Sequence, residues 1–222
     1  MDYAQAFENE IVTENLVNDI GKKIMSIFKF IGDLIKKAIS FLTTHLSKLA
    51  RIKKTDKDPT PNSQTGAGAE VMQKKEPKAV YAEDCYDCGN ELTGIVNDID
   101  FCLQLLMKRP KPDYKVNKNY GERWEQDNSL IADRMNRCMN DLNKLEGIDR
   151  KTVSEETGEK LKARLESLNT QYEKYARIYQ MFINKHQGIE QYMVSTQMSF
   201  NLISSTASKA LEIILKMYTP AE

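Results

Sequence analysis

Cys85 and Cys88 have the spacing of half a zinc knuckle, in which a tight turn points two thiolates at one metal ion. Tetrahedral zinc needs two more ligands. The other two cysteines fall on apolar faces of expected helices, and both histidines are isolated in the sequence. Free cysteine commonly packs as a small hydrophobic side chain. We therefore expect no metal and no cofactor, and a structural zinc site or a redox pair at Cys85 and Cys88 is the less favoured interpretation.

A second candidate for chemistry is the basic segment 108–124, which interleaves lysine and arginine with Tyr114, Tyr120 and Trp124. Such a pattern suits single-stranded nucleic acid, because cations contact phosphates while rings stack on bases. Acidic residues dilute the positive field, and the whole chain has 32 basic and 32 acidic residues. We expect a solvated loop with Trp124 at the end of a helical bundle, and no nucleic-acid partner.

The sequence contains none of the common catalytic motifs that we sought: a glycine-rich phosphate loop, HExxH or GxSxG. We therefore predict that the protein is not an enzyme, with no catalytic residues and no small-molecule substrate. The start of the chain lacks the basic region of a secretory signal, and lysines interrupt its richest apolar stretch. We expect a cytoplasmic protein, neither secreted nor membrane-spanning.

The secondary structure expected to position any functional residues is helical, and the longest helix is expected after Thr152. From Leu161 to Met217, apolar residues recur at alternating steps of four and three, which predicts packing against another helix. Because the phase is unbroken, we favour one helix of roughly 100 Å, and a hairpin at His186–Gly188 is the alternative. The large rings favour an antiparallel or multi-helix bundle. The predicted contact residues here are Leu161, Leu165, Leu168, Tyr172, Tyr179, Phe182, Phe200, Ile203 and Ile214.

The apolar periodicity of residues 1–52 predicts a strongly amphipathic helix. The charges are unevenly distributed along it, with five acids and no bases up to Asp19 and nine bases from Ile20 to Lys54. Its apolar face can dock on protein, or residues 1–54 can lie on a membrane surface with lysines at the headgroups. The predicted contact residues of this helix are Ile20, Ile24, Ile27, Phe28, Ile31, Leu34, Ile35 and Leu42.

Residues 53–84 combine proline, glycine and charge without periodicity, which is typical of a flexible linker. Residues 85–222 predict a helical bundle. Its shorter helices are expected at Asn90–Lys108 and Asp127–Glu146, the second followed by Gly147. Its long helix opens with Thr152 and Glu155 in capping-box spacing. The predicted fold class is all-α: an elongated bundle or coiled coil with a long C-terminal helix, plus a tethered N-terminal helix that can act away from the main body.

The N-terminal segment AFENEIVTENLVNDI, continuing into GKKIMSIFKFIGDLIKKAISFLTTHLSKL and a polar linker, resembles the openings of virion or prohead-interior structural proteins of tailed bacteriophages. The resemblance covers about the first 55 residues and implies a helical body carried inside or on the capsid, in the virion or the host cytoplasm. We transfer no functional residues from it.

We therefore predict a non-enzymatic structural protein that acts through helix–helix association. Its expected partners are further copies of itself or other structural proteins. The alternative is a peripheral membrane-binding protein that uses the cationic N-terminal helix.

Overall fold

The computed structural model describes residues 3–55, 85–108, 118–183 and 190–217. In this part of the chain it is an all-α bundle of five helices. The elements in chain order are α1 (Tyr3–Thr55), β1 (Tyr86–Asp87), α2 (Gly89–Lys108), α3 (Lys118–Glu146), β2 (Lys151–Thr152), α4 (Glu155–Ile183) and α5 (Glu190–Lys216). The two short strands form a parallel pair, in which Tyr86 lies opposite Lys151.

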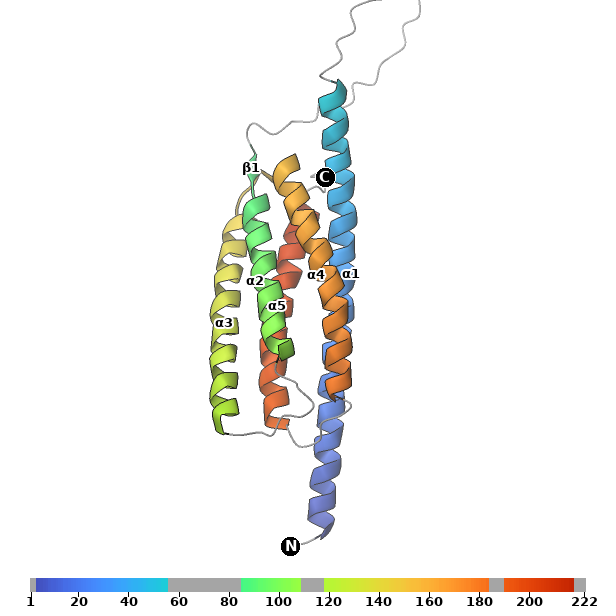
Figure 1. Cartoon of the computed structure of the whole chain (residues 1–222), viewed down its shortest axis with the longest axis vertical. Coiled ribbons are helices and arrows are strands. Elements are labelled where there is room, and N and C mark those ends of the chain that lie inside the picture. Colours follow the sequence, from blue (N-terminus) through green and yellow to red (C-terminus); the bar gives the residue numbers. More distant parts are fainter. Residues whose placement is uncertain (1–2, 56–84, 109–117, 184–189, 218–222) are drawn as a thin grey trace, which may run out of the picture.

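Successive helices run in alternating directions, and the strand pair lies at the end of the bundle where α2 and α4 begin (Figure 1). The all-α prediction is confirmed. Because α1, α4 and α5 are neighbours, the large rings pack within a multi-helix arrangement, as the sequence indicated.

The region after Thr152 does not form the single long helix that we favoured. The ring of Phe28 lies 4.9 Å from that of Tyr172 on α4 and 4.5 Å from that of Phe200 on α5. In one straight helix, Tyr172 and Phe200 would be about 42 Å apart. The chain therefore reverses between Ile183 and Glu190, the stretch in which the hairpin alternative placed the turn. Residues 184–189 themselves lie outside the described residues.

The N-terminal helix is part of the same core as the rest of the chain, and not a separate unit. One buried cluster contains Ile24, Ile35 and Leu42 of α1 together with Leu165 of α4 and Phe200 of α5. The separation of the N-terminal helix from the body is therefore wrong for this structure. Most of the expected linker, residues 56–84, lies outside the described residues.

Two helix starts also differ from the sequence prediction. The first turn of α4 is capped by Ser154, whose hydroxyl accepts the backbone N–H of Thr157 at 3.2 Å. Thr152, the expected cap, lies in β2 instead. Helix α3 begins at Lys118, nine residues before Asp127, and therefore includes Trp124, which is buried. The end of α3 at Glu146, followed by Gly147, is as expected.

Candidate functional site

The apolar residues predicted to contact a partner lie mostly inside the chain. Twelve of them are buried: Ile24, Phe28, Ile31, Ile35, Leu42, Leu161, Leu165, Leu168, Tyr172, Phe200, Ile203 and Ile214. Ile27 and Leu34 are partly buried against the same cluster. The side chains of Ile20, Tyr179 and Phe182 lie outside the described residues. The assignment of these apolar helix faces to an intermolecular interface is corrected, because α1, α4 and α5 cover one another.

Cys85 and Cys88 lie at the two ends of β1, which is extended and not a tight turn. Extended chain rises about 3.3 Å per residue, so the two thiols do not share the compact loop of a zinc knuckle. The Cys88 thiol is buried, donates to the Thr152 carbonyl at 3.3 Å, and lies 3.4 Å from the sulfur of Met217. In the described part of the chain, no three His, Cys, Asp or Glu side chains are grouped to hold a metal.

Burial controls the chemistry of these thiols. It raises the pKa of Cys88 to about 11 and the pKa of both Cys102 and Cys138 to about 12. A thiol is nucleophilic as its thiolate, so these three groups are inert near neutral pH. Cys138 borders an open groove of about 390 Å³ between α2 and α3, which is lined by both acids and bases, among them Glu91, Asp98, Arg137 and Lys144.

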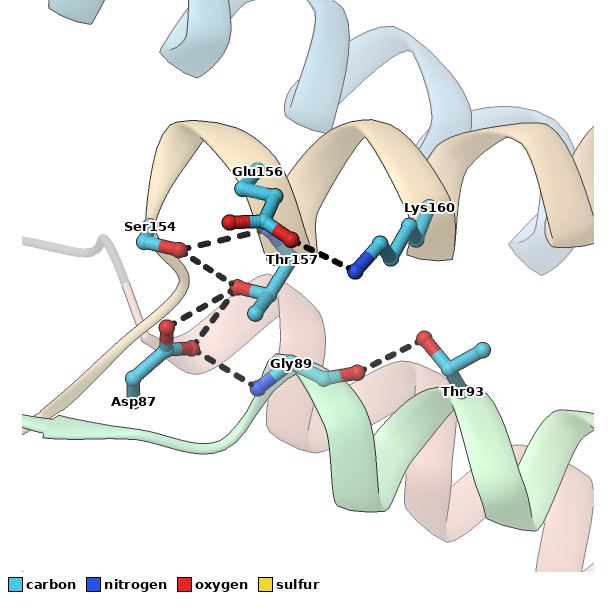
Figure 2. A network of polar contacts seen from close by, with 7 residues as sticks. All are labelled: Asp87, Gly89, Thr93, Ser154, Glu156, Thr157 and Lys160. Carbon is cyan, nitrogen blue, oxygen red and sulfur yellow. Dashed lines mark hydrogen bonds and ion pairs between the residues drawn. The ribbon is translucent and has the colours of Figure 1, made fainter.

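A polar network ties the start of α2 to the start of α4 beside the strand pair (Figure 2). The carboxylate of Asp87 accepts the N–H of Gly89 at 3.0 Å and the hydroxyl of Thr157 at 2.8 Å. Burial alone would raise the pKa of Asp87, but the hydrogen bonds from Gly89, Thr157 and Ser154 outweigh it and lower the pKa. The side chains of Asp87, Ser154 and Thr157 are bonded to one another and to Gly89, so the network fixes the start of α2 against the start of α4.

A second polar cluster lies between α2 and α4 around Asp100, which is buried. Its carboxylate accepts hydrogen bonds from Gln104 at 3.0 Å, from Arg164 at 3.3 Å and from the hydroxyl of Tyr175 at 3.4 Å. Burial, followed by the negative charge of Asp100, raises the pKa of Tyr175 to about 12. A buried carboxylate paired in this way fixes the relative position of two helices.

The N-terminal part of α1 extends beyond the helices that the structure describes around it (Figure 1). Helix α1 has 53 residues, whereas the longest of the others have 29. These lengths correspond to about 80 Å and about 44 Å. Among the α1 residues whose side chains the structure describes, which are Asp19 and those from Gly21 to Arg51, Gly21 is the first that is buried. Figure 1 shows α1 continuing past the ends of its neighbours on the N-terminal side.

The surface of α1 that faces away from the bundle is strongly basic. We define the cationic face as the exposed residues Lys22, Lys23, Lys29, Lys36, Lys37, Lys48 and Arg51. Asp33 is the one exposed acid among Lys22 to Arg51, and Phe30 lies in the middle of this stretch with 55% of its surface exposed. Lys36 also forms an ion pair with Glu173 of α4 at 3.1 Å. The separate acidic and basic segments were visible in the sequence, but the outward position of the lysines required the packing.

Comparison with protein-family models, with curated protein sequences and with solved structures gave no match. The described residues include no helix that is both long and apolar enough to cross a membrane. The candidate functional site is therefore assigned from geometry alone: the N-terminal part of α1, which continues past its neighbours in Figure 1, and the adjoining cationic face.

Proposed function

We propose that the chain is a non-enzymatic assembly protein that acts through helix–helix association, and that residues 3–20 of α1 make the contact. The single observation that supports this proposal is the length of α1. About 27 Å of helix precedes Gly21, and Figure 1 shows that this part of α1 continues past the neighbouring helices. Most of the stability of a helix in a protein comes from packing, so contact with a partner helix would stabilise this part of α1.

We place this activity in the virion of a tailed bacteriophage. The support for that setting is the resemblance of the first 55 residues to virion and prohead-interior proteins, which includes the protruding segment. An assembly protein of this kind presents a helix to its neighbours while a folded body holds that helix at a fixed angle.

Light scattering coupled to gel filtration tests the proposal with two chains, the full chain and one that begins at Gly21. The shorter chain keeps all the residues of α1 that the structure describes as buried, from Gly21 to Leu46, and circular dichroism checks that it is folded. We expect the full chain to assemble and the shorter chain to be monomeric. Equal masses per particle for the two chains, after correction for the deleted residues, would refute the assignment.

A second candidate function is binding to an anionic membrane, and the cationic face is the observation that favours it. The mode in which the apolar face of α1 enters the lipid conflicts with the structure, because Ile24, Phe28 and Ile31 pack in the core. The remaining mode is electrostatic, with lysines at the headgroups and Phe30 inserted between them. Co-flotation with phosphatidylglycerol vesicles, lost at high salt, is the expected result for this function.

A further inference from the structure

Gly94 lies in the middle of α2, and no contact within the described residues explains its missing side chain. A glycine inside a helix costs about 1 kcal/mol relative to alanine. A Cβ added at Gly89 or Gly158 would lie 2.4 Å or 2.8 Å from another side chain, whereas a Cβ added at Gly94 would meet nothing within 4 Å. Gly94 lines the groove between α2 and α3. Its missing side chain therefore keeps this groove open, at a cost to the stability of α2.

The groove is bounded at both ends, which suits a small molecule better than a helix that runs along it. Tyr86 and Ile148 line the end beside the strand pair. Toward the other end, the ion pair between Asp98 and Arg134 joins α2 to α3. Between these ends the lining of α3 spans residues 137–145, which is about 12 Å of helix. The volume of about 390 Å³ is in the range of small-molecule sites.

The lining of the groove divides into an apolar floor and a charged rim. The floor consists of the buried residues of the lining, which are Ile95, Cys138 and Leu145. On the rim, Asp141 pairs with Lys144 at 2.8 Å. Glu91 accepts the hydroxyl of Tyr86 at 2.5 Å, and Asp98 is held by the ion pair across the helices. The acidic side chains of the rim are therefore engaged within the chain.

Arg137 is a cation of the rim without such a partner. Its Nε donates to the backbone carbonyl of Asp133 at 3.3 Å. In the part of the chain that the structure describes, its two terminal nitrogens make no hydrogen bond or ion pair. A guanidinium presents parallel N–H donors that match the two oxygens of a carboxylate. The groove therefore offers a carboxylate-binding group at its rim, beside an apolar floor.

We propose that this groove binds a small apolar monocarboxylate. The carboxylate lies on Arg137, and the apolar body lies on Ile95 and Leu145, in the space that Gly94 leaves. A cationic amphiphile is disfavoured because the acids of the rim already have partners, and an uncharged one leaves Arg137 without a counter-ion. The site goes beyond the proposed assembly function, since it lies between α2 and α3, and α3 lies across the bundle from α1 (Figure 1).

Isothermal titration calorimetry of the full chain with octanoate tests this site, with octanol and octylammonium as the uncharged and cationic probes. We expect octanoate to bind with a dissociation constant below about 1 mM, and the other two probes to bind at least about 10-fold more weakly. Arg137→Gln removes the charged donors and should raise the dissociation constant of octanoate at least about 10-fold. The matched control is Arg123→Gln, an exposed arginine about 21 Å away on the same helix, which should leave it unchanged.

Gly94→Leu tests the groove from the side of α2, because the new side chain fills it. Circular dichroism is expected to show a folded chain, and the dissociation constant of octanoate should again rise at least about 10-fold. The matched control is Asn97→Leu, an exposed position of α2 outside the lining, which should bind octanoate like the original chain. Octanoate binding that is unchanged in Arg137→Gln or in a folded Gly94→Leu overturns the site. Stronger binding of octylammonium, or no binding of octanoate, overturns it as well, and neither result alters the particle masses that test the assembly function.

Discussion

The junction between α2 and α4 makes a quantitative prediction for Gly89. A Cβ added at this position would lie 2.4 Å from both Cβ and Oγ1 of Thr157. The hydroxyl of Thr157 is held by Asp87 and by Ser154, at 2.9 Å from the latter, so the side chain has little freedom to move away (Figure 2). Substituting Gly89→Ala must therefore separate the two helix starts or break the network.

The effect of Gly89→Ala on the free energy of unfolding follows from three contributions of known size. Overpacking costs about 1–3 kcal/mol and a lost hydrogen bond about 1 kcal/mol, whereas alanine gains about 0.5–1 kcal/mol over glycine in a helix. We expect the free energy of unfolding of Gly89→Ala to fall by about 1–3 kcal/mol. Urea unfolding followed by circular dichroism measures it.

Gly94 supplies the matched control on the same helix. It is exposed, and a Cβ added there meets nothing within 4 Å. We therefore expect Gly94→Ala to raise the free energy of unfolding by about 0.5–1 kcal/mol. A difference between the two variants of less than about 0.5 kcal/mol would refute the close approach of α2 and α4 at Gly89.

Three further predictions concern single side chains. Phe28→Ala is expected to cost about 3–5 kcal/mol, because its ring contacts α4 and α5, whereas Phe30→Ala on the exposed side should change stability by less than about 0.5 kcal/mol, both by urea unfolding. Burial lowers the pKa of His45, despite its hydrogen bond to Val153 and with a smaller contribution from Lys48. Stability tied to neutral His45 is thus complete above the unfolded value of about 6.5 and is lost as pH falls below it, so unfolding between about pH 7 and 5 should depend less on pH in His45→Gln. In a thiol titration of the native chain near pH 8, Cys85 is expected to react much faster than the three buried cysteines, and all 4 should react after denaturation.

The faces of the short helices could be predicted because their periodicity reports local burial. On α2, the apolar residues that recur with helical periodicity are all buried, namely Leu92, Ile95, Val96, Ile99, Leu103 and Leu106. On α3, Ile131, Met135 and Leu142 are buried, but Leu130 is 37% exposed. Leu130 directly precedes Ile131, and adjacent residues on a helix point about 100° apart, so both cannot be central to one face.

The hairpin between α4 and α5 could not be assigned with confidence from the heptad phase. The seams of both helices are buried in the structure, from Leu161 to Tyr175 and again from Phe200 to Ile214. Their phases coincide although the chain reverses between them, because phase records which side of a helix is covered and not the direction of the chain. The direction of the chain follows from the contacts of Phe28 with both helices, and these contacts join residues that are far apart in the sequence.

The same limit explains why the sequence misplaced the interaction surface. A row of apolar residues along a helix indicates that another surface packs against it. In α1, α4 and α5 that surface belongs to other helices of the same chain. Once those seams are used internally, a partner must be sought where helix length exceeds the bundle and where charge is left facing outward. Both conditions meet on α1, whose acidic first part extends beyond the core and whose basic second part faces away from it. Under the proposed function, a partner would contact the length of α1 that extends past the bundle and the charge that α1 leaves facing outward, while the apolar face of α1 completes the core of its own chain.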